Sequence, residues 1–140
     1  MIARLAEGAM RQAASDARLD IRIDSAGTGS WHVGAPPDPR AQATALHHGI
    51  DISHLRARQV EVTDYRTFSH IFALDRDNLR TLISAAPANS TAEISLLLDC
   101  VAGKEGTPVA DPYYGGDEGF QEAWADVALA AAVLTERFCG

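Results

Sequence analysis

The sequence is poor in positive charge and has no long apolar run. Of its 140 residues, 12 are Lys or Arg and 19 are Asp or Glu, which gives a formal charge of −7. Nucleic acids and anionic membranes are bound through basic surfaces, so this balance argues against both as partners. The longest apolar run, 127–134, is much shorter than the roughly 20 residues of a membrane-spanning helix. We therefore expect no membrane span.

Cysteine is also scarce. Cys100 and Cys139 are the two cysteines of the chain, and they form neither a Cys-x-x-Cys pair nor a disulfide framework. A reducing, cytoplasmic location fits this usage, and the N-terminal residues lack the pattern of a signal peptide. The five histidines, including the pair His47-His48, show no spacing typical of a metal site, so we expect no metal.

The length and composition predict one domain with its own core. A chain of 140 residues, 46% of them hydrophobic, can bury roughly two thirds of the surface that its unfolded form exposes. Disulfides or metals are not needed at this size. We expect residues 1–140 to form a single domain; its oligomeric state cannot be predicted.

Hydrophobic periodicity predicts an alternation of helices and strands. A terminal amphipathic helix is indicated by Phe120, Trp124, Val127, Ala131, Leu134 and Phe138, which recur at helical spacing. The other expected elements are helices at 2–17, 39–48 and 76–85, and strands at 20–25, 70–74 and 94–98. This order predicts an α/β sandwich of three layers with a mostly parallel sheet, whose ligands bind at the carboxyl ends of strands.

The stretch Asp111-Pro112-Tyr113-Tyr114 is the most informative for chemistry. Pro112 restricts Asp111 to extended geometry, and two tyrosines beside a carboxylate suggest an aromatic wall and a proton source. Taken alone, the stretch is better explained as an ordinary Asp-Pro turn with packed tyrosines.

Further motifs along the chain favour a catalytic role for this stretch over an ordinary turn. They occur in a fixed order from Leu5 to Phe138, and together they resemble the low-molecular-weight protein tyrosine phosphatases. The motifs are Asp24-Ser25-Ala26-Gly27-Thr28-Gly29-Ser30-Trp31, Pro36-Pro37-Asp38-Pro39-Arg40, His48-Gly49-Ile50, Ser53-His54 with Ala57-Arg58-Gln59, Leu74-Asp75-Arg76-Asp77-Asn78-Leu79 and Asp111-Pro112-Tyr113-Tyr114-Gly115.

The resemblance implies hydrolysis of a phosphotyrosine protein or a small aryl phosphate, without a cofactor. In that family a Cys-x5-Arg loop binds phosphate, and its thiolate attacks phosphorus to form a phosphocysteine. Asp111 matches the aspartate that protonates the departing phenolate. Trp31, Tyr113 and Tyr114 match residues that line the substrate cleft, although Trp31 is equally well explained as a packing residue.

Three polar residues match positions that support the phosphate loop: Ser25, His54 and Asp75. Each also has an ordinary structural interpretation. Ser25 would end a strand, His54 would be a surface histidine, and Asp75 is well suited to cap the helix that begins at Arg76. The cap can coexist with any other role.

The chain departs from the family at its chemical centre, because it contains no Cys-x5-Arg. Gly106 stands six residues after Cys100, and Ile2-Ala3-Arg4 occupies the place expected for Arg-Ser-Pro. Either a natural loss or an altered gene reading explains this difference. The resemblance then implies that the first, central strand is missing, so we expect impaired stability and catalytic deficiency.

The sequence also allows interpretations other than this one. A pseudophosphatase that binds a partner through Trp31, Tyr113 and Tyr114 without turnover remains open. Gly27-Thr28-Gly29 hints at dinucleotide binding, but the third glycine is absent and prolines follow, so that interpretation is rejected. Arsenate reductases have the same fold, yet they require further redox cysteines.

Overall fold

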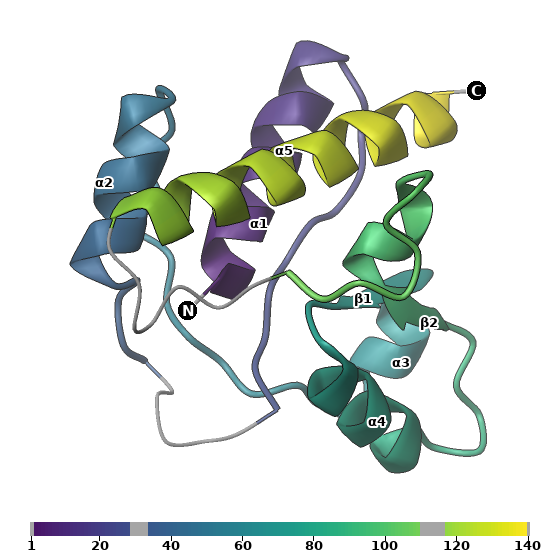
Figure 1. The fold of residues 1–140 in the computed structure, drawn as a ribbon. Coiled ribbons are helices and arrows are strands. Elements are labelled where there is room, and N and C mark those ends of the chain that lie inside the picture. Colours follow the sequence, from purple (N-terminus) through teal and green to yellow (C-terminus); the bar gives the residue numbers. More distant parts are fainter. Residues whose placement is uncertain (1, 29–33, 110–116, 140) are drawn as a thin grey trace.

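The computed structural model describes residues 2–28, 34–109 and 117–139. In these residues three helices come before the first strand, and the two short strands then alternate with the later helices (Figure 1). The elements are α1 (Ile2–Asp16), α2 (Pro39–His47), α3 (Asp64–Thr67), β1 (His70–Ala73), α4 (Arg76–Ala85), β2 (Glu93–Leu96), the 3-10 helix η1 (Leu97–Cys100) and α5 (Asp117–Cys139). Among the described residues, no helix is both long enough and apolar enough to cross a membrane.

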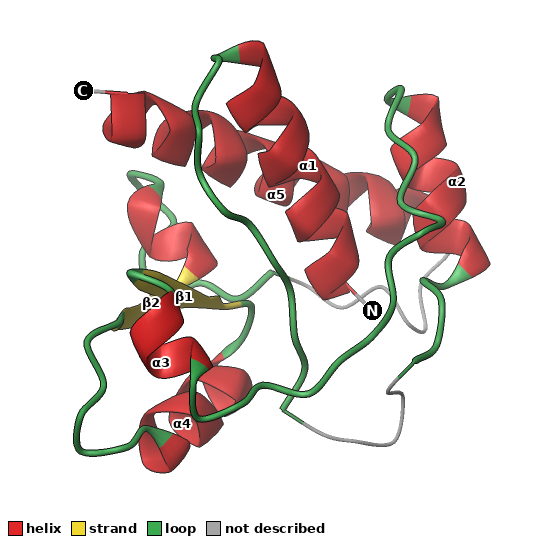
Figure 2. Ribbon diagram, turned by 180° about the vertical axis from the view of Figure 1, so that it is seen from behind, coloured by secondary structure: helices red, strands yellow, loops and turns green. Residues whose placement is uncertain are grey.

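The larger core lies between α1, α2 and α5, which group on one side of the strands (Figure 2). The apolar stripe predicted for the terminal helix is confirmed, since Phe120, Val127, Ala131 and Leu134 are each at most 3% exposed. Leu5 of α1 is fully buried in the same core. This burial explains why the two helices pack along each other.

The strands β1 and β2 are parallel, with His70 opposite Glu93 and Ala73 opposite Leu96. Alternation along β1 sends neighbouring side chains to opposite faces of the sheet. Phe72 packs against the larger core, whereas Ala73 joins a smaller cluster with Tyr65 of α3 and Leu82 of α4. A parallel sheet therefore separates two helical layers, as the α/β prediction requires.

Two predicted strands need correction. Residues 20–25 were expected to form a strand, but they belong to no strand, and the nearby pairing is an isolated bridge from Gly27 to Gln59. Alternating isoleucines give a segment strand propensity, yet a strand exists only where a neighbour accepts its hydrogen bonds. The predicted strand 94–98 ends at Leu96, because the Asp99 carboxylate accepts the Leu96 N–H at 3.2 Å and turns the chain into η1.

The helices are close to prediction. α4 occupies its predicted range, and α1 and α2 end one residue before theirs. α3, a single turn of four residues, was not predicted, because so short a helix has no periodicity to detect.

Candidate functional site

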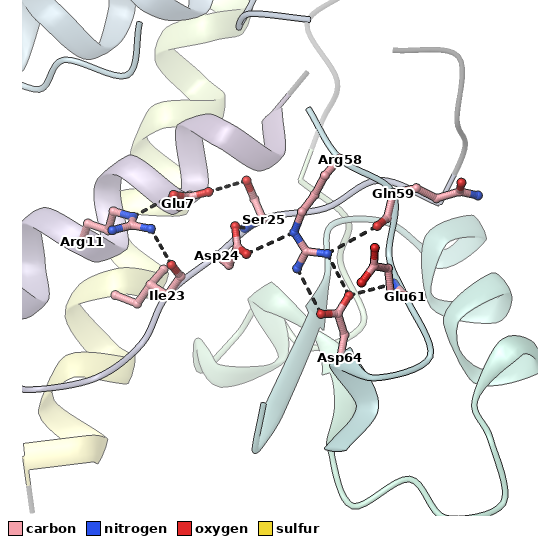
Figure 3. A network of polar contacts seen from close by, with 9 residues as sticks. All are labelled: Glu7, Arg11, Ile23, Asp24, Ser25, Arg58, Gln59, Glu61 and Asp64. Carbon is pink, nitrogen blue, oxygen red and sulfur yellow. Dashed lines mark hydrogen bonds and ion pairs between the residues drawn. The ribbon is translucent and has the colours of Figure 1, made fainter. Parts of the chain in front are cut away.

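Ser25 is held by a buried carboxylate of α1 (Figure 3). Its Oγ donates to Oε1 of Glu7 at 2.5 Å, and Glu7 is only 5% exposed. Arg11 donates to Oε2 of Glu7 at 2.7 Å and to the Ile23 carbonyl oxygen at 2.7 Å. Both oxygens of the buried carboxylate are thus satisfied, which compensates for its desolvation. The hydroxyl of Ser25 is committed to this contact.

Arg58 joins the same extended segment to α3. Its guanidinium donates to Asp24 at 3.1 Å and to both carboxylate oxygens of Asp64 at 2.9 and 3.2 Å. Burial alone would raise the pKa of Asp64, but the bonds from Arg58 and from the Glu61 N–H outweigh it and lower that pKa. The hydrogen bond to Asp64 in turn raises the pKa of Arg58.

A cavity of about 720 Å³ lies beside these residues, and both Ser25 and Asp75 line it. Arg4, from the first turn of α1, lines it as well, and its buried Nε has no hydrogen-bond partner. Burial lowers the pKa of Arg4, although the charge of Glu7 opposes this shift. Much of the cavity wall is apolar, and the polar side chains that line it include those of Arg4, Ser25 and Asp75.

Asp75 caps α4, as its position before Arg76 predicted. Its side chain accepts the Asn78 N–H at 2.7 Å, while its own backbone is extended. This satisfies one of the donors that the first turn of a helix leaves unpaired. Asp75 also lies two residues beyond the end of β1, so it stands at the carboxyl end of a parallel strand.

His54 lies apart from these two residues. Its side chain is exposed and lines a separate hollow of about 240 Å³ with Gly8 and Arg11. The structure therefore brings Ser25 and Asp75 to one cavity and places His54 at another. The remaining predicted site residues, Trp31, Asp111, Tyr113 and Tyr114, lie outside the described residues.

Cys100 sits in η1 as a half-buried free thiol and does not line the large cavity. Its Sγ donates to the Leu97 carbonyl oxygen at 3.1 Å. Burial raises the pKa of the thiol, despite the opposing charge of Arg137. Because the thiolate is the nucleophile, this environment disfavours attack by Cys100.

Three residues of this region, Arg4, Glu7 and Arg58, were not predicted as site residues. Glu7 and Arg4 lie in a stretch that indicates only a helix, so no spacing distinguished them. Arg58 belongs to the Ala57-Arg58-Gln59 motif, but that motif gave it no role.

Across the described ranges, no three His, Cys, Asp or Glu side chains are grouped as metal ligands.

The fold and this cavity define an α/β protein with polar groups gathered at the carboxyl end of a parallel strand. Comparison with known proteins identifies the family. Residues 2–138 match the model of the low molecular weight phosphotyrosine protein phosphatase family, and the chain belongs to that family.

Individual relatives support this family membership. Low molecular weight phosphotyrosine protein phosphatase 1 of Drosophila melanogaster is 41% identical over 120 residues, which are 84% of this chain and 77% of the relative. The Schizosaccharomyces pombe phosphatase of the same description is 39% identical over 123 residues, 86% of this chain and 78% of the relative. The crystal structure of Primo-1 superposes with a TM-score of 0.91 at 36% identity, covering 98% of this chain and 90% of that one.

Proposed function

We propose that this chain is the scaffold of a phosphotyrosine phosphatase and does not by itself hydrolyse phosphate esters. The observation that carries the proposal is the absence of a nucleophile: no arginine stands six residues after Cys100 or Cys139. The surroundings of Cys100 support it, because burial raises the pKa of that thiol and so disfavours the thiolate. Without an attacking thiolate, no aryl oxygen departs, so a proton donor has no group to protonate.

The remaining residues are assigned roles that need a Cys-x5-Arg loop beside them. In such a form the thiolate attacks phosphorus, the aryl oxygen leaves with a proton from Asp111, and water then cleaves the phosphocysteine. Trp31, Tyr113 and Tyr114 would flank the aromatic ring of the substrate. Ser25 and Asp75, which share a cavity, would position the loop, and His54 would act from outside that cavity.

A second candidate follows from the same absence. A chain that retains Trp31, Tyr113 and Tyr114 but lacks the nucleophile would bind a phosphotyrosine protein without turnover. Binding and hydrolysis are separable measurements, so one set of variants tests both candidates.

The test is hydrolysis of p-nitrophenyl phosphate at mildly acidic pH by the 140-residue chain and by a form with a grafted Cys-x5-Arg strand and loop. We expect no turnover by the chain and turnover by the graft. Replacing the grafted cysteine with serine, or Asp111→Asn in the graft, should abolish or strongly reduce the rate. Turnover by the ungrafted chain would overturn the proposal. Saturable binding of a phosphotyrosine peptide without turnover would support the second candidate.

A further inference from the structure

The large cavity is bordered on two sides by extended backbone. One border is the segment 21–28, and the other is the run 67–75 that contains β1. Its remaining walls are largely apolar and come from both helical layers, with Ala6, Val127 and Ala131 on one side and Leu82 on the other. The charged side chains of Arg4 and Glu7 on α1 also line it. The cavity thus lies in the plane of the sheet, at the edge of β1 that β2 does not occupy.

The pairing of β1 shows which of its backbone groups face the cavity. The Glu93 N–H donates to the Ser69 carbonyl oxygen at 2.9 Å, and Glu93 is opposite His70. In a parallel ladder this register turns the N–H and C=O groups of Ile71 and Ala73 toward β2. Those of His70 and Phe72 therefore point the other way, and the described contacts contain no backbone partner for them.

The opposite border is unpaired as well. Among the described hydrogen bonds, the backbone of 21–24 takes part in one, from the side chain of Arg11 to the Ile23 carbonyl oxygen. Ladder bonds from this region begin only at Gly27, whose N–H donates to the Arg58 carbonyl oxygen at 2.8 Å. Two rows of unpaired peptide groups consequently face one cavity.

We propose that this cavity binds an extended apolar peptide of another chain, which adds a strand between segment 21–24 and β1. A peptide backbone supplies donors and acceptors to both rows at once. A strand covered on both faces is rich in Val and Ile, so apolar side chains suit both helical layers. An apolar cavity of about 150 Å³ holds one benzene, so about 720 Å³ has room for roughly five side chains of that size.

Other occupants satisfy fewer of these groups. A small apolar molecule would fill the volume but leave the backbone N–H and C=O groups unpaired. A second copy would have to insert its own sheet edge, which is flanked by helices and cannot enter between two helical layers. An isolated strand with basic ends suits both the cavity and the charge of −7.

The probe is the peptide acetyl-Lys-Lys-Val-Ile-Val-Val-Ile-Lys-amide, titrated into the full chain. Its matched control has proline at the two central positions, because proline cannot donate to a ladder. We expect the melting temperature to rise with the concentration of the first peptide and not with the control. The amides of His70 and Phe72 should exchange at least about tenfold more slowly, whereas those of Ile71 and Ala73, already bonded to β2, should change little.

A filled cavity supplies the second arm of the test. Ala131, 3% exposed, lines the cavity, and Leu129 of the same helix is 43% exposed, so Ala131→Phe is compared with Leu129→Phe. We expect Ala131→Phe to weaken peptide binding at least about tenfold and Leu129→Phe to leave it unchanged. If Ala131→Phe loses helical circular dichroism, Ala6→Leu on α1 replaces it.

Equal binding of both peptides, or unchanged exchange at His70 and Phe72, would overturn the proposal. The peptide contains no cysteine, so this result is independent of whether the chain hydrolyses phosphate esters.

Discussion

The Tyr65 hydroxyl donates a 2.8 Å hydrogen bond to the Leu82 carbonyl oxygen, joining α3 to the last turn of α4. Carbonyl groups in the last turn of a helix have no partner within that helix. Tyr65 is 1% exposed, so water cannot replace its hydroxyl. The bond therefore acts as a helix cap supplied from a neighbouring element.

Tyr65→Phe is expected to reduce the free energy of unfolding by about 1–3 kcal/mol, because it leaves a buried acceptor unpaired. Urea denaturation measures this, and an unchanged m-value shows that the compactness of the two states is preserved. An unaltered midpoint would mean that the Leu82 carbonyl finds another donor.

Asp64→Asn is expected to cost roughly 1–3 kcal/mol at neutral pH, because it removes a charged acceptor from Arg58. The folded-state pKa of Asp64 is lowered, so its contribution is present above the unfolded pKa of about 4 and is lost as the pH falls through the folded value. The stability difference between wild type and variant should shrink in that acidic range.

The matched control for Asp64 is Asp77→Asn. Asp77 pairs with Arg80 on the surface, with 83% of its side chain exposed. Exposed pairs contribute little, so we expect a change within about 0.5 kcal/mol. A loss equal to that of Asp64→Asn would show that both effects come from net charge.

Asp75→Ala is expected to destabilise the chain by about 1 kcal/mol through the lost cap of α4, whereas Asp75→Asn should retain most of the stability. Thermal unfolding of both variants provides the measurement. Equal destabilisation would indicate that the charge of Asp75, rather than its capping oxygen, is what matters.

Cys100 should react slowly with iodoacetamide at neutral pH, at least about tenfold slower than an unstructured cysteine, since burial raises its pKa. A Cys139→Ser background leaves Cys100 as the remaining thiol. Denaturant should restore the ordinary rate. Fast alkylation of the folded chain would contradict the protonated state inferred for this thiol.

Local signals predicted the helices well. Asp38 accepts the Arg40 N–H at 2.7 Å and Pro39 occupies the first turn, so α2 begins where the sequence indicates. Asp75 does the same for α4. These signals succeed because capping depends on residues a few positions apart.

Signals between distant segments were lost. The alternation of Ile21 and Ile23 predicts a strand, but pairing depends on a neighbour that the segment itself cannot specify. The contact between Ser25 and Glu7 spans 18 positions, and that between Arg58 and Asp24 spans 34. Neither is visible in spacing, so the polar part of the cavity wall emerged only from the fold.

The contacts made by Arg58 also affect how the protein unfolds. Asp64 and α3 belong to the side of the sheet with the small core, while Asp24 precedes Ser25, which is tied to α1 of the larger core. One side chain thus adds a polar link between two hydrophobic clusters that also share the strands β1 and β2. Its loss would loosen the segment at Asp24 from α3, while the strands that carry residues of both clusters would still couple their unfolding.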